Sequence, residues 1–283
     1  MTKLKESRVG KISIYLAYHK NSEIFRNELY RPVHVGAAGA SHHLDIERDD
    51  IGDNISIKNG QYAELTAVYW AWKNDRDSDF IGLGHYRRIP VFSLGRLRLS
   101  LIICYLKYFL KRYFILRLPR GEYFLSKTIL MRSSEFKGIL NEQEVYLHKM
   151  VIKNALLVPR KTHFATNSVK SFFNRVVSDT AFKDIELSIS NELVKKDFVR
   201  MLNENSMYIA NIVVMRKDLF DKYCEFLFST LASFVERSEE KGIKHSSRFL
   251  GYVGELLTSS YIIHLQGQGV SWSSFDLAEI TDV

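Results

Sequence analysis

Apolar and polar positions follow two periods along the chain, and together they predict strands interleaved with helices. Apolar runs ended by polar or small residues predict buried strands at 12–17, 32–36, 80–84, 155–158 and 209–215. Apolar residues at helical spacing predict helices at 59–73, 142–153, 217–236 and 249–265, a largely helical stretch at 167–205, and then a tail rich in Gly and Ser. This order predicts an α/β fold with its site at the carboxyl edge of the sheet.

Length and composition place this pattern in one soluble domain. The 283 residues, 46% of them hydrophobic and 25% charged, exclude a wholly disordered chain, and we expect a single domain over 1–283. Cys104 and Cys224 both lie in apolar surroundings, which favours buried thiols in a reducing compartment. No uncharged apolar run approaches the ~20 residues that span a bilayer. We therefore expect a cytoplasmic protein.

The charge of the chain is uneven. The net charge is +8, and no acidic residue occurs between Pro90 and Gly121. We interpret residues 91–125 as an inserted basic, amphipathic segment. Two alternatives stay open for it: a helix lying on the anionic inner leaflet, which would attach the protein peripherally to the membrane, or a helical hairpin packed on its own domain.

Residues 54–74 are dense in hydrogen-bonding groups. If Asn59 caps the predicted helix, Asn54 and Lys58 lie close to its positive end, a place suited to an anion. Glu64 lies at the edge of the apolar face and is either solvated or hydrogen-bonded inside a cleft. Trp70 belongs to an aromatic stripe of the kind that is usually core, and it is also a candidate for packing against a sugar.

A second cluster follows the predicted strand at 80–84. His85, Arg87 and Arg88 combine an imidazole with two guanidinium forks, which suits a pyrophosphate. Continued strand alternation would place His85 and Arg87 on one side and Arg88 on the other. Gly82 and Gly84 would let a ligand or another backbone approach closely. The alternative is a solvated basic strand end.

An Asp-x-Asp motif of the kind that binds a metal ion occurs in the chain, but it lies before the strand at 80–84 and not after it. Asp75-Arg76-Asp77 precedes the strand at 80–84, in what we interpret as a surface turn, whereas a sugar transferase that uses a metal would carry its Asp-x-Asp after such a strand. Arginine charge would then replace a metal ion at the diphosphate, so we predict no metal site.

Two polar groups interrupt the apolar segments of the C-terminal half. Asn211 lies inside the predicted strand at 209–215, where its amide needs a partner, either a sugar hydroxyl or neighbouring backbone. Arg248, Tyr252 and Glu255 share one face of the last helix. Arg248 and Glu255 either form a structural ion pair, or Glu255 acts as a base on a sugar hydroxyl.

These segments resemble a known family, the bacterial capsular and exopolysaccharide glycosyltransferases long described as a domain of unknown function. The matching pieces are DNISIKNGQYAELTAVYWAWKN (53–74), IGLGHYRR (81–88), YIANIVVMRKDLFDKYCEFLF (208–228), RFLGYVGELL (248–257) and, more loosely, PVHVGAA (32–38). The resemblance implies a GT-A-like, Rossmann-like mixed sheet flanked by helices. It also implies transfer of a hexosyl or galactofuranosyl group from a nucleotide sugar to surface polysaccharide, O-antigen or capsule units.

The resemblance and the chemistry of the individual residues together predict which residues bind the donor, which bind the acceptor and which take part in catalysis. We expect a UDP-sugar donor, no further cofactor, and a glycan or lipid-linked acceptor. Donor binding is assigned to Asn54, Lys58, Asn59, Glu64, His85, Arg87, Arg88 and Asn211; catalysis to Glu255, His85 and Arg87; and acceptor binding to Arg248, Tyr252 and Trp70.

Two functions of other classes remain as alternatives. A nucleic-acid-binding protein would account for the charge of +8, although its basic residues should interleave with aromatics across one face. The other alternative is a membrane-associated scaffold of polysaccharide assembly without catalytic activity. We expect an enzyme that binds no nucleic acid.

Overall fold

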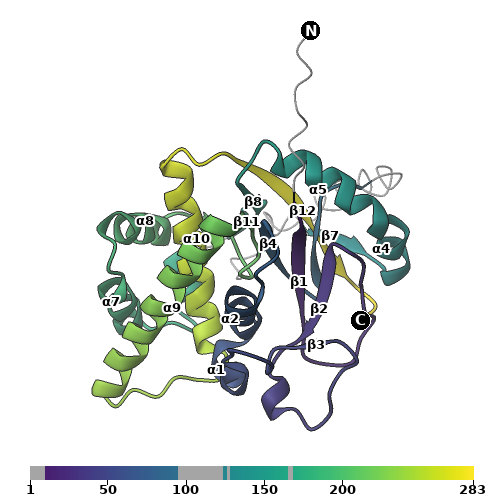
Figure 1. Cartoon of the computed structure of the whole chain (residues 1–283). Coiled ribbons are helices and arrows are strands. Elements are labelled where there is room, and N and C mark those ends of the chain that lie inside the picture. Colours follow the sequence, from purple (N-terminus) through teal and green to yellow (C-terminus); the bar gives the residue numbers. More distant parts are fainter. Residues whose placement is uncertain (1–9, 95–123, 126–127, 165–167) are drawn as a thin grey trace, which may run out of the picture.

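The computed structural model describes residues 10–94, 124–125, 128–164 and 168–283 of the chain, and Figure 1 shows their arrangement. The basic segment predicted at 91–125 lies almost wholly outside these residues, and so does Cys104. Cys224 is fully buried, as predicted. No helix in the described part of the chain is long and apolar enough to cross a membrane.

A mixed sheet of nine strands forms the centre of the molecule. Its strands run in the order β11-β8-β12-β5-β4-β1-β2-β3, with β7 beside β12 and a further pairing between β11 and β4. The strands are β1 (Ile12–Tyr18), β2 (Tyr30–His34), β3 (Glu47–Arg48), β4 (Phe80–His85), β5 (Arg88–Val91), β7 (Thr128–Met131), β8 (Leu156–Pro159), β11 (Val214–Arg216) and β12 (Trp272–Ile280). The predicted α/β class with a mixed sheet is therefore confirmed.

Parallel pairing of β1 with both β2 and β4 brings three strand ends to one edge. Every residue of β1 is buried, which is why this strand reads as a continuous apolar run in the sequence. A Cβ on Gly82 would lie 2.8 Å from Val214 of β11, and one on Gly84 would lie 2.7 Å from Leu16 of β1. Both glycines are therefore required for packing inside the protein.

Helices cover both faces of these strands. Tyr15 of β1 meets Trp70 of α2 edge-on at 5.7 Å, whereas Tyr30 of β2 meets Phe136 of α4 at 5.8 Å. Tyr30 lies opposite Ile14 in the register, so Tyr15 and Tyr30 point to opposite faces. The helices are α1 (Asn59–Tyr62), α2 (Leu65–Asn74), α4 (Ser133–Ile139), α5 (Gln143–Val151), α6 (Val169–Phe173), α7 (Asp179–Ser188), α8 (Glu192–Asn203), α9 (Lys217–Glu240) and α10 (Phe249–Gly267).

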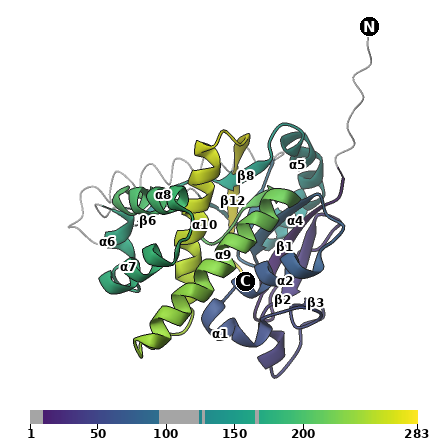
Figure 2. The ribbon, with the colours of Figure 1, turned by 60° about the vertical axis from the view of Figure 1, so that its left-hand side comes forward.

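A smaller lobe lies beside the main sheet, and Figure 2 shows it to the left of α10. It contains α6, α7, α8 and a three-stranded sheet of β6 (Phe124–Leu125), β9 (Thr162–Phe164) and β10 (Ser206–Met207). The long helices α9 and α10 pack on each other, and they also pack on α7 and α8 respectively. They therefore join the lobe to the sheet.

Two predicted elements of the C-terminal half differ from the structure. The tail expected after the last helix is β12, a strand that pairs with β5, β7 and β8. Asp276 and Glu279 interrupt its apolar positions, which hides it in the sequence. The strand predicted at 209–215 is strand only from Val214, because Ala210 and Asn211 adopt left-handed backbone angles.

Candidate functional site

A cavity of about 250 Å³ opens at the carboxyl ends of β1, β2 and β4. It lies at the edge of the sheet where α/β proteins bind ligands, as predicted from the strand order. Its lining residues are Ala17, His19, Val35, Asn59, Ala63, Glu64, His85, Tyr86, Arg87, Arg88, Arg248 and Glu279. We call it the first cavity.

A tight hairpin brings His85, Arg87 and Arg88 together. β4 ends at His85, the chain turns over Tyr86 and Arg87, and β5 starts at Arg88, which pairs with His85. All three predicted side chains therefore line the first cavity. The expected alternation, with Arg88 on the other side from His85, is wrong because the strand does not continue past His85.

Arginines carry the positive charge of the first cavity. Arg87 is exposed, Arg88 is partly buried, and Arg248 reaches in from the start of α10. His85 donates from Nε2 to the carbonyl oxygen of Ala210 at 2.7 Å. Burial lowers the pKa of His85, and the charges of Arg88 and Arg248 act in the same direction, against Glu64. The shift favours the neutral imidazole, so the positive charge in the described lining of this cavity comes mainly from the arginines.

Glu64 is held in place inside the first cavity. Its side chain is 12% exposed. One carboxylate oxygen accepts a hydrogen bond from Asn211 Nδ2 at 2.9 Å, and the other lies 3.7 Å from the guanidinium of Arg248. Of the two alternatives for Glu64, the hydrogen-bonded one is observed. A carboxylate fixed in this way is suited to accept hydrogen bonds from ligand hydroxyl groups.

The side-chain amide of Asn211 forms hydrogen bonds to other groups of the protein. Besides Glu64, Nδ2 donates to the carbonyl oxygen of Gly251 at 3.3 Å, and Oδ1 accepts from the Thr258 hydroxyl at 3.0 Å. Thr258 in turn is 2.7 Å from the hydroxyl of Tyr223. Only 2% of Asn211 is exposed. The structure therefore places Asn211 behind Glu64 as its support rather than in contact with a sugar hydroxyl.

Left-handed backbone concentrates around the first cavity. In the described part of the chain the non-glycine residues with positive φ are Ala63, Ala210, Asn211 and Arg248. Ala63 and Arg248 line the cavity, Ala210 binds His85, and Asn211 binds Glu64. Each such residue costs on the order of 1 kcal/mol, and such strain is typical of functional sites.

Ala63 also breaks the helix predicted from residue 59. With φ at 50° it ends α1, and α2 begins only at Leu65. Asn59 is the first residue of α1 and does not cap a helix with its side chain; Nδ2 donates to the Ala63 carbonyl at 2.8 Å and to Thr66 Oγ1 at 3.2 Å. Asn59 thereby fixes the strained turn and still lines the cavity.

A second cavity of about 360 Å³ adjoins the first and shares Arg88 with it. Its lining residues are Arg88, Phe172, Phe173, Arg175, Val176, Ile209, Tyr252 and Glu255. Arg248, Tyr252 and Glu255 were predicted on one helix face. The structure divides them, because α10 begins at Phe249, after Arg248: Arg248 lines the first cavity and the other two line the second.

Glu255 has an ionisation suited to proton transfer near neutral pH. Burial and, after it, the charge of Glu64 together raise its pKa from 4.5 to about 7, although a hydrogen bond from the Ala210 backbone and the charges of Arg88 and Arg248 oppose the shift. Ala210 therefore contacts His85 through its carbonyl and Glu255 through its N–H, and its neighbour Asn211 binds Glu64. One strained turn holds the three groups.

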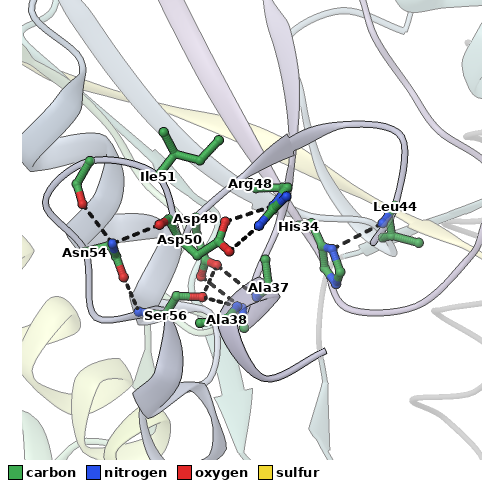
Figure 3. A network of polar contacts seen from close by, with 12 residues as sticks. His34, Ala37, Ala38, Leu44, Arg48, Asp49, Asp50, Ile51, Asn54 and Ser56 are labelled. Atoms are coloured by element: carbon green, nitrogen blue, oxygen red, sulfur yellow. Dashed lines mark hydrogen bonds and ion pairs between the residues drawn. The ribbon is translucent and has the colours of Figure 1, made fainter. Parts of the chain in front are cut away.

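Three predicted binding residues lie outside both cavities. Asn54 donates to the carbonyl oxygens of Asp50 and Gly52 (Figure 3), and Lys58 is exposed. Trp70 is buried in the core, where Nε1 donates to the Ile51 carbonyl at 2.8 Å. The structure thus gives Asn54 and Trp70 partners within the protein.

The network in Figure 3 supports the cavity from behind. Asp49 is fully buried, and its carboxylate accepts hydrogen bonds from the backbone of Gly36 and Ala37 and from the Ser56 hydroxyl. Gly36 has φ at 71°, and a Cβ there would lie 2.8 Å from Asn59. Asp49 therefore holds the loop after Val35, a lining residue, against Asn59.

Asp75 and Asp77 do not reach the cavities either. Asp75 lies in the turn before β4 and is buried, not at the surface as expected. Its carboxylate accepts from the hydroxyls of Tyr15 and Ser78, both at 2.7 Å. Asp77 is exposed. The turn is thus a structural support for the start of β4.

Among the histidines and charged residues that line the first cavity, two were not found from the sequence. His19 directly follows β1, and His85 is the last residue of the neighbouring β4, so the shared strand edge was a signal that could have indicated His19. Glu279 lies on β12, where it accepts from Thr128 at 3.3 Å, and no local pattern points to it.

Comparison with known proteins places the chain in a family. The profile of the family described as domain of unknown function (DUF4422) matches residues 13–266. The chain belongs to this family. Among solved structures, the apo structure of "WbbM bifunctional glycosytransferase" matches with a TM-score of 0.75 and 24% identity. The match covers 96% of this chain and 46% of that one, so this DUF4422 chain spans about half of the neighbour's length. No curated protein matches.

Replacing Asn211 by Ala is expected to lower the free energy of unfolding by about 2 kcal/mol or more, because the buried partners of its amide lose their hydrogen bonds. Urea denaturation measures the loss. The control is Asn203→Ala, since Asn203 is exposed and its amide donates to the Val199 carbonyl in the same helix. Equal unfolding midpoints for the two variants would contradict the supporting role of Asn211.

Proposed function

We propose that the protein is a glycosyltransferase that moves a sugar from a nucleotide diphosphate to a hydroxyl group of a surface glycan acceptor. The observation that carries the proposal is the first cavity, which Arg87, Arg88 and Arg248 line together with the fixed carboxylate of Glu64 at the carboxyl edge of the sheet. The DUF4422 assignment and the fold shared with one part of a bifunctional glycosyltransferase support it.

The donor would lie in the first cavity. Guanidinium groups donate two parallel hydrogen bonds to phosphate oxygens, so Arg87 and Arg88 would bind the diphosphate and stabilise its charge as it leaves. Glu64 would accept hydrogen bonds from hydroxyls of the transferred sugar. Because the positive charge of this cavity comes from side chains, we propose a UDP-sugar donor bound without a metal ion.

The acceptor hydroxyl would lie toward Glu255, beyond Arg88. In a single displacement its oxygen bonds to the anomeric carbon, while the bond from that carbon to the diphosphate oxygen breaks. The electron pair of the broken bond stays on the diphosphate, and the hydroxyl proton passes to the Glu255 carboxylate. A base on the side opposite the leaving group gives inversion at the anomeric carbon.

The acceptor class completes the proposal. We propose a lipid-linked repeat unit of a capsule, exopolysaccharide or O-antigen, glycosylated at the cytoplasmic face of the membrane. Excess positive charge favours work beside anionic lipid or an anionic acceptor. The role of residues 91–125 in membrane attachment stays a prediction.

A thermal-shift screen of UDP-, GDP- and dTDP-sugars, each with Mn²⁺ and with EDTA, tests the proposal. We expect one UDP-sugar to raise the melting temperature equally in both conditions, because a ligand at 100 times its Kd adds about 2.7 kcal/mol of stability. Stabilisation that needs Mn²⁺ would contradict metal-free binding. If no nucleotide sugar stabilises the protein, the proposal of a glycosyltransferase is refuted and the alternative of a non-catalytic scaffold is favoured.

A further inference from the structure

His19 lines the first cavity, and no step of the proposed transfer uses it. It directly follows β1, and Ala17 of β1 pairs with His85 of β4, so the two histidines lie at the same edge of the sheet. His85 already uses its Nε2 for the Ala210 carbonyl, whereas His19 is exposed to solvent. His19 is therefore the histidine of this edge that a ligand can reach with its ring unoccupied.

The His19 ring is oriented without being paired. In the described part of the chain, neither of its nitrogens takes part in a hydrogen bond or an ion pair. The ring meets Tyr86 edge-on, with 5.1 Å between the ring centres and 80° between the planes. Tyr86 is fixed in turn, because its backbone N–H donates to the Ala17 carbonyl at 3.1 Å. Since Tyr86 directly precedes Arg87, the imidazole lies beside the turn that would bind the diphosphate.

Positive groups predominate around His19. Burial lowers its pKa, and the charges of Arg248, Lys20 and His85 lower it further, against Glu64. Without a ligand, the ring therefore favours its neutral form. A diphosphate would reverse the sign of the local charge, and a negative charge nearby favours the imidazolium. The titratable and charged groups that face His19 in and around the cavity are Lys20, Glu64, His85, Tyr86, Arg87, Arg88, Arg248 and Glu279.

His19 and the proposed base lie in different cavities. His19 lines the first cavity and Glu255 the second, and Arg88 is shared by both. In a single displacement, the bond to the leaving group breaks on the side of the anomeric carbon away from the attacking hydroxyl. With the acceptor at Glu255, the leaving diphosphate would therefore lie in the first cavity, where His19 is.

We propose that His19 is a further catalytic residue, which takes up a proton from solvent when the nucleotide sugar binds and donates an N–H to the diphosphate as it leaves. This inference rests on the proposed function. The electron pair of the broken bond stays on the phosphate oxygen, and the imidazolium stabilises the charge that develops there. When the nucleoside diphosphate departs, the ring returns its proton to solvent.

The test is calorimetric titration with the nucleotide sugar that stabilises the protein, at pH 7 in two buffers of different ionisation enthalpy. Each phosphate of a nucleotide sugar has a single, strongly acidic ionisation, so the ligand itself does not titrate in this range. We expect the wild type to take up a fraction of a proton for each donor bound. The affinity for the donor should accordingly fall by about threefold or more between pH 6 and pH 8, because the complex binds more protons than the free protein.

Variants assign the proton to His19. His19→Gln can still form hydrogen bonds but cannot take up a proton, so the uptake should fall below half of the wild-type value. Turnover should fall about 10- to 10²-fold. Glu255→Gln should keep the uptake, which excludes Glu255 as its source. The matched control is His148→Gln on α5, outside both cavities, which should keep both the uptake and the turnover.

A second measurement covers a variant that binds the donor too weakly for calorimetry. The ring resonance of His19 in the wild type, identified by its absence from His19→Gln, should titrate with a higher pKa in the presence of the donor than in its absence. This NMR measurement needs no binding by the variant.

The outcomes distinguish the inference from the proposed function. A wild type that takes up no proton, an uptake kept in His19→Gln, or a ring pKa that the donor leaves unchanged overturns the inference, while stabilisation by the nucleotide sugar leaves the transferase standing. Absence of stabilisation by any nucleotide sugar overturns both. Uptake that is lost in His19→Gln and kept in Glu255→Gln supports both.

Discussion

Replacement of Glu255 by Gln is expected to lower kcat by about 10²- to 10⁴-fold, the range typical of a lost general base. Gln fills the same space and accepts hydrogen bonds, but it cannot take the proton of the acceptor hydroxyl. Transfer of sugar from the UDP-sugar found in the screen measures the loss. Glu236→Gln is the matched control, since Glu236 is exposed on α9.

The pH dependence identifies the proton acceptor. Burial raises the pKa of Glu255 to about 7, and only the deprotonated carboxylate acts as a base. The rate of the wild type should therefore rise between pH 6 and pH 8, and the residual rate of Glu255→Gln should lack this step. A step of the same height and midpoint in the variant would assign the base elsewhere.

The folding stability of the wild type should fall over the same pH range in which its rate rises. A carboxyl whose pKa is higher in the folded than in the unfolded protein favours folding at low pH, and this contribution is lost as pH rises through the folded value, here about 7. Glu255→Gln removes the cost of the buried charge, so its melting temperature should exceed that of the wild type by about 3 °C or more at pH 8. The difference should shrink as pH falls below 7 and vanish near pH 4, below the unfolded value of 4.5. A destabilised variant at pH 8 would contradict the unfavourable burial of this carboxylate.

Arg87→Ala is expected to lower turnover by about 10²-fold or more, the scale seen when one group that stabilises developing charge is removed. Arg87 is exposed in the turn between β4 and β5 and lines the first cavity. The fold should therefore survive the change, and thermal melting verifies this. The measurement is kcat with the same donor, together with the stabilisation that UDP provides.

Two further variants make this result specific. Arg87→Lys keeps the charge but not the planar fork, so its turnover should lie between those of the wild type and Arg87→Ala. Arg76→Ala alters the net charge equally outside both cavities and should retain wild-type turnover. Wild-type turnover in a folded Arg87→Ala variant would remove Arg87 from the binding of the diphosphate.

The sequence predicts those parts of the fold that depend on residues close together in the chain. β1 and β4 are continuous apolar runs because both are buried, and α9 shows its buried stripe at helical spacing. Parallel strands end at one edge, so the sequence alone predicts that the residues following the apolar run at 80–84 lie at a site. His85, Arg87 and Arg88 do line one cavity there.

The contacts that position the site residues cannot be predicted from the neighbouring sequence. Asn211 is separated from Glu64 by 147 positions, and only the packing of α10 against α1 and the Ala210–Asn211 turn brings them within 2.9 Å. The left-handed angle of Ala63 contradicts the high helix propensity of alanine, so a propensity argument continues the helix through it. These features arise from contacts between distant segments.

Periodicity, composition and strand-end chemistry by themselves determined the α/β class, the edge of the sheet that carries the site, and the basic groups found there. Tertiary structure alone decided that burial lowers the pKa of His85 and raises the pKa of Glu255 to about 7, that Asn211 supports Glu64, and that β12 lies inside the sheet. The physical reason is the range of the forces involved. Backbone geometry and side-chain periodicity act between near neighbours in the chain, whereas burial and charge act through space, between residues that only folding brings together.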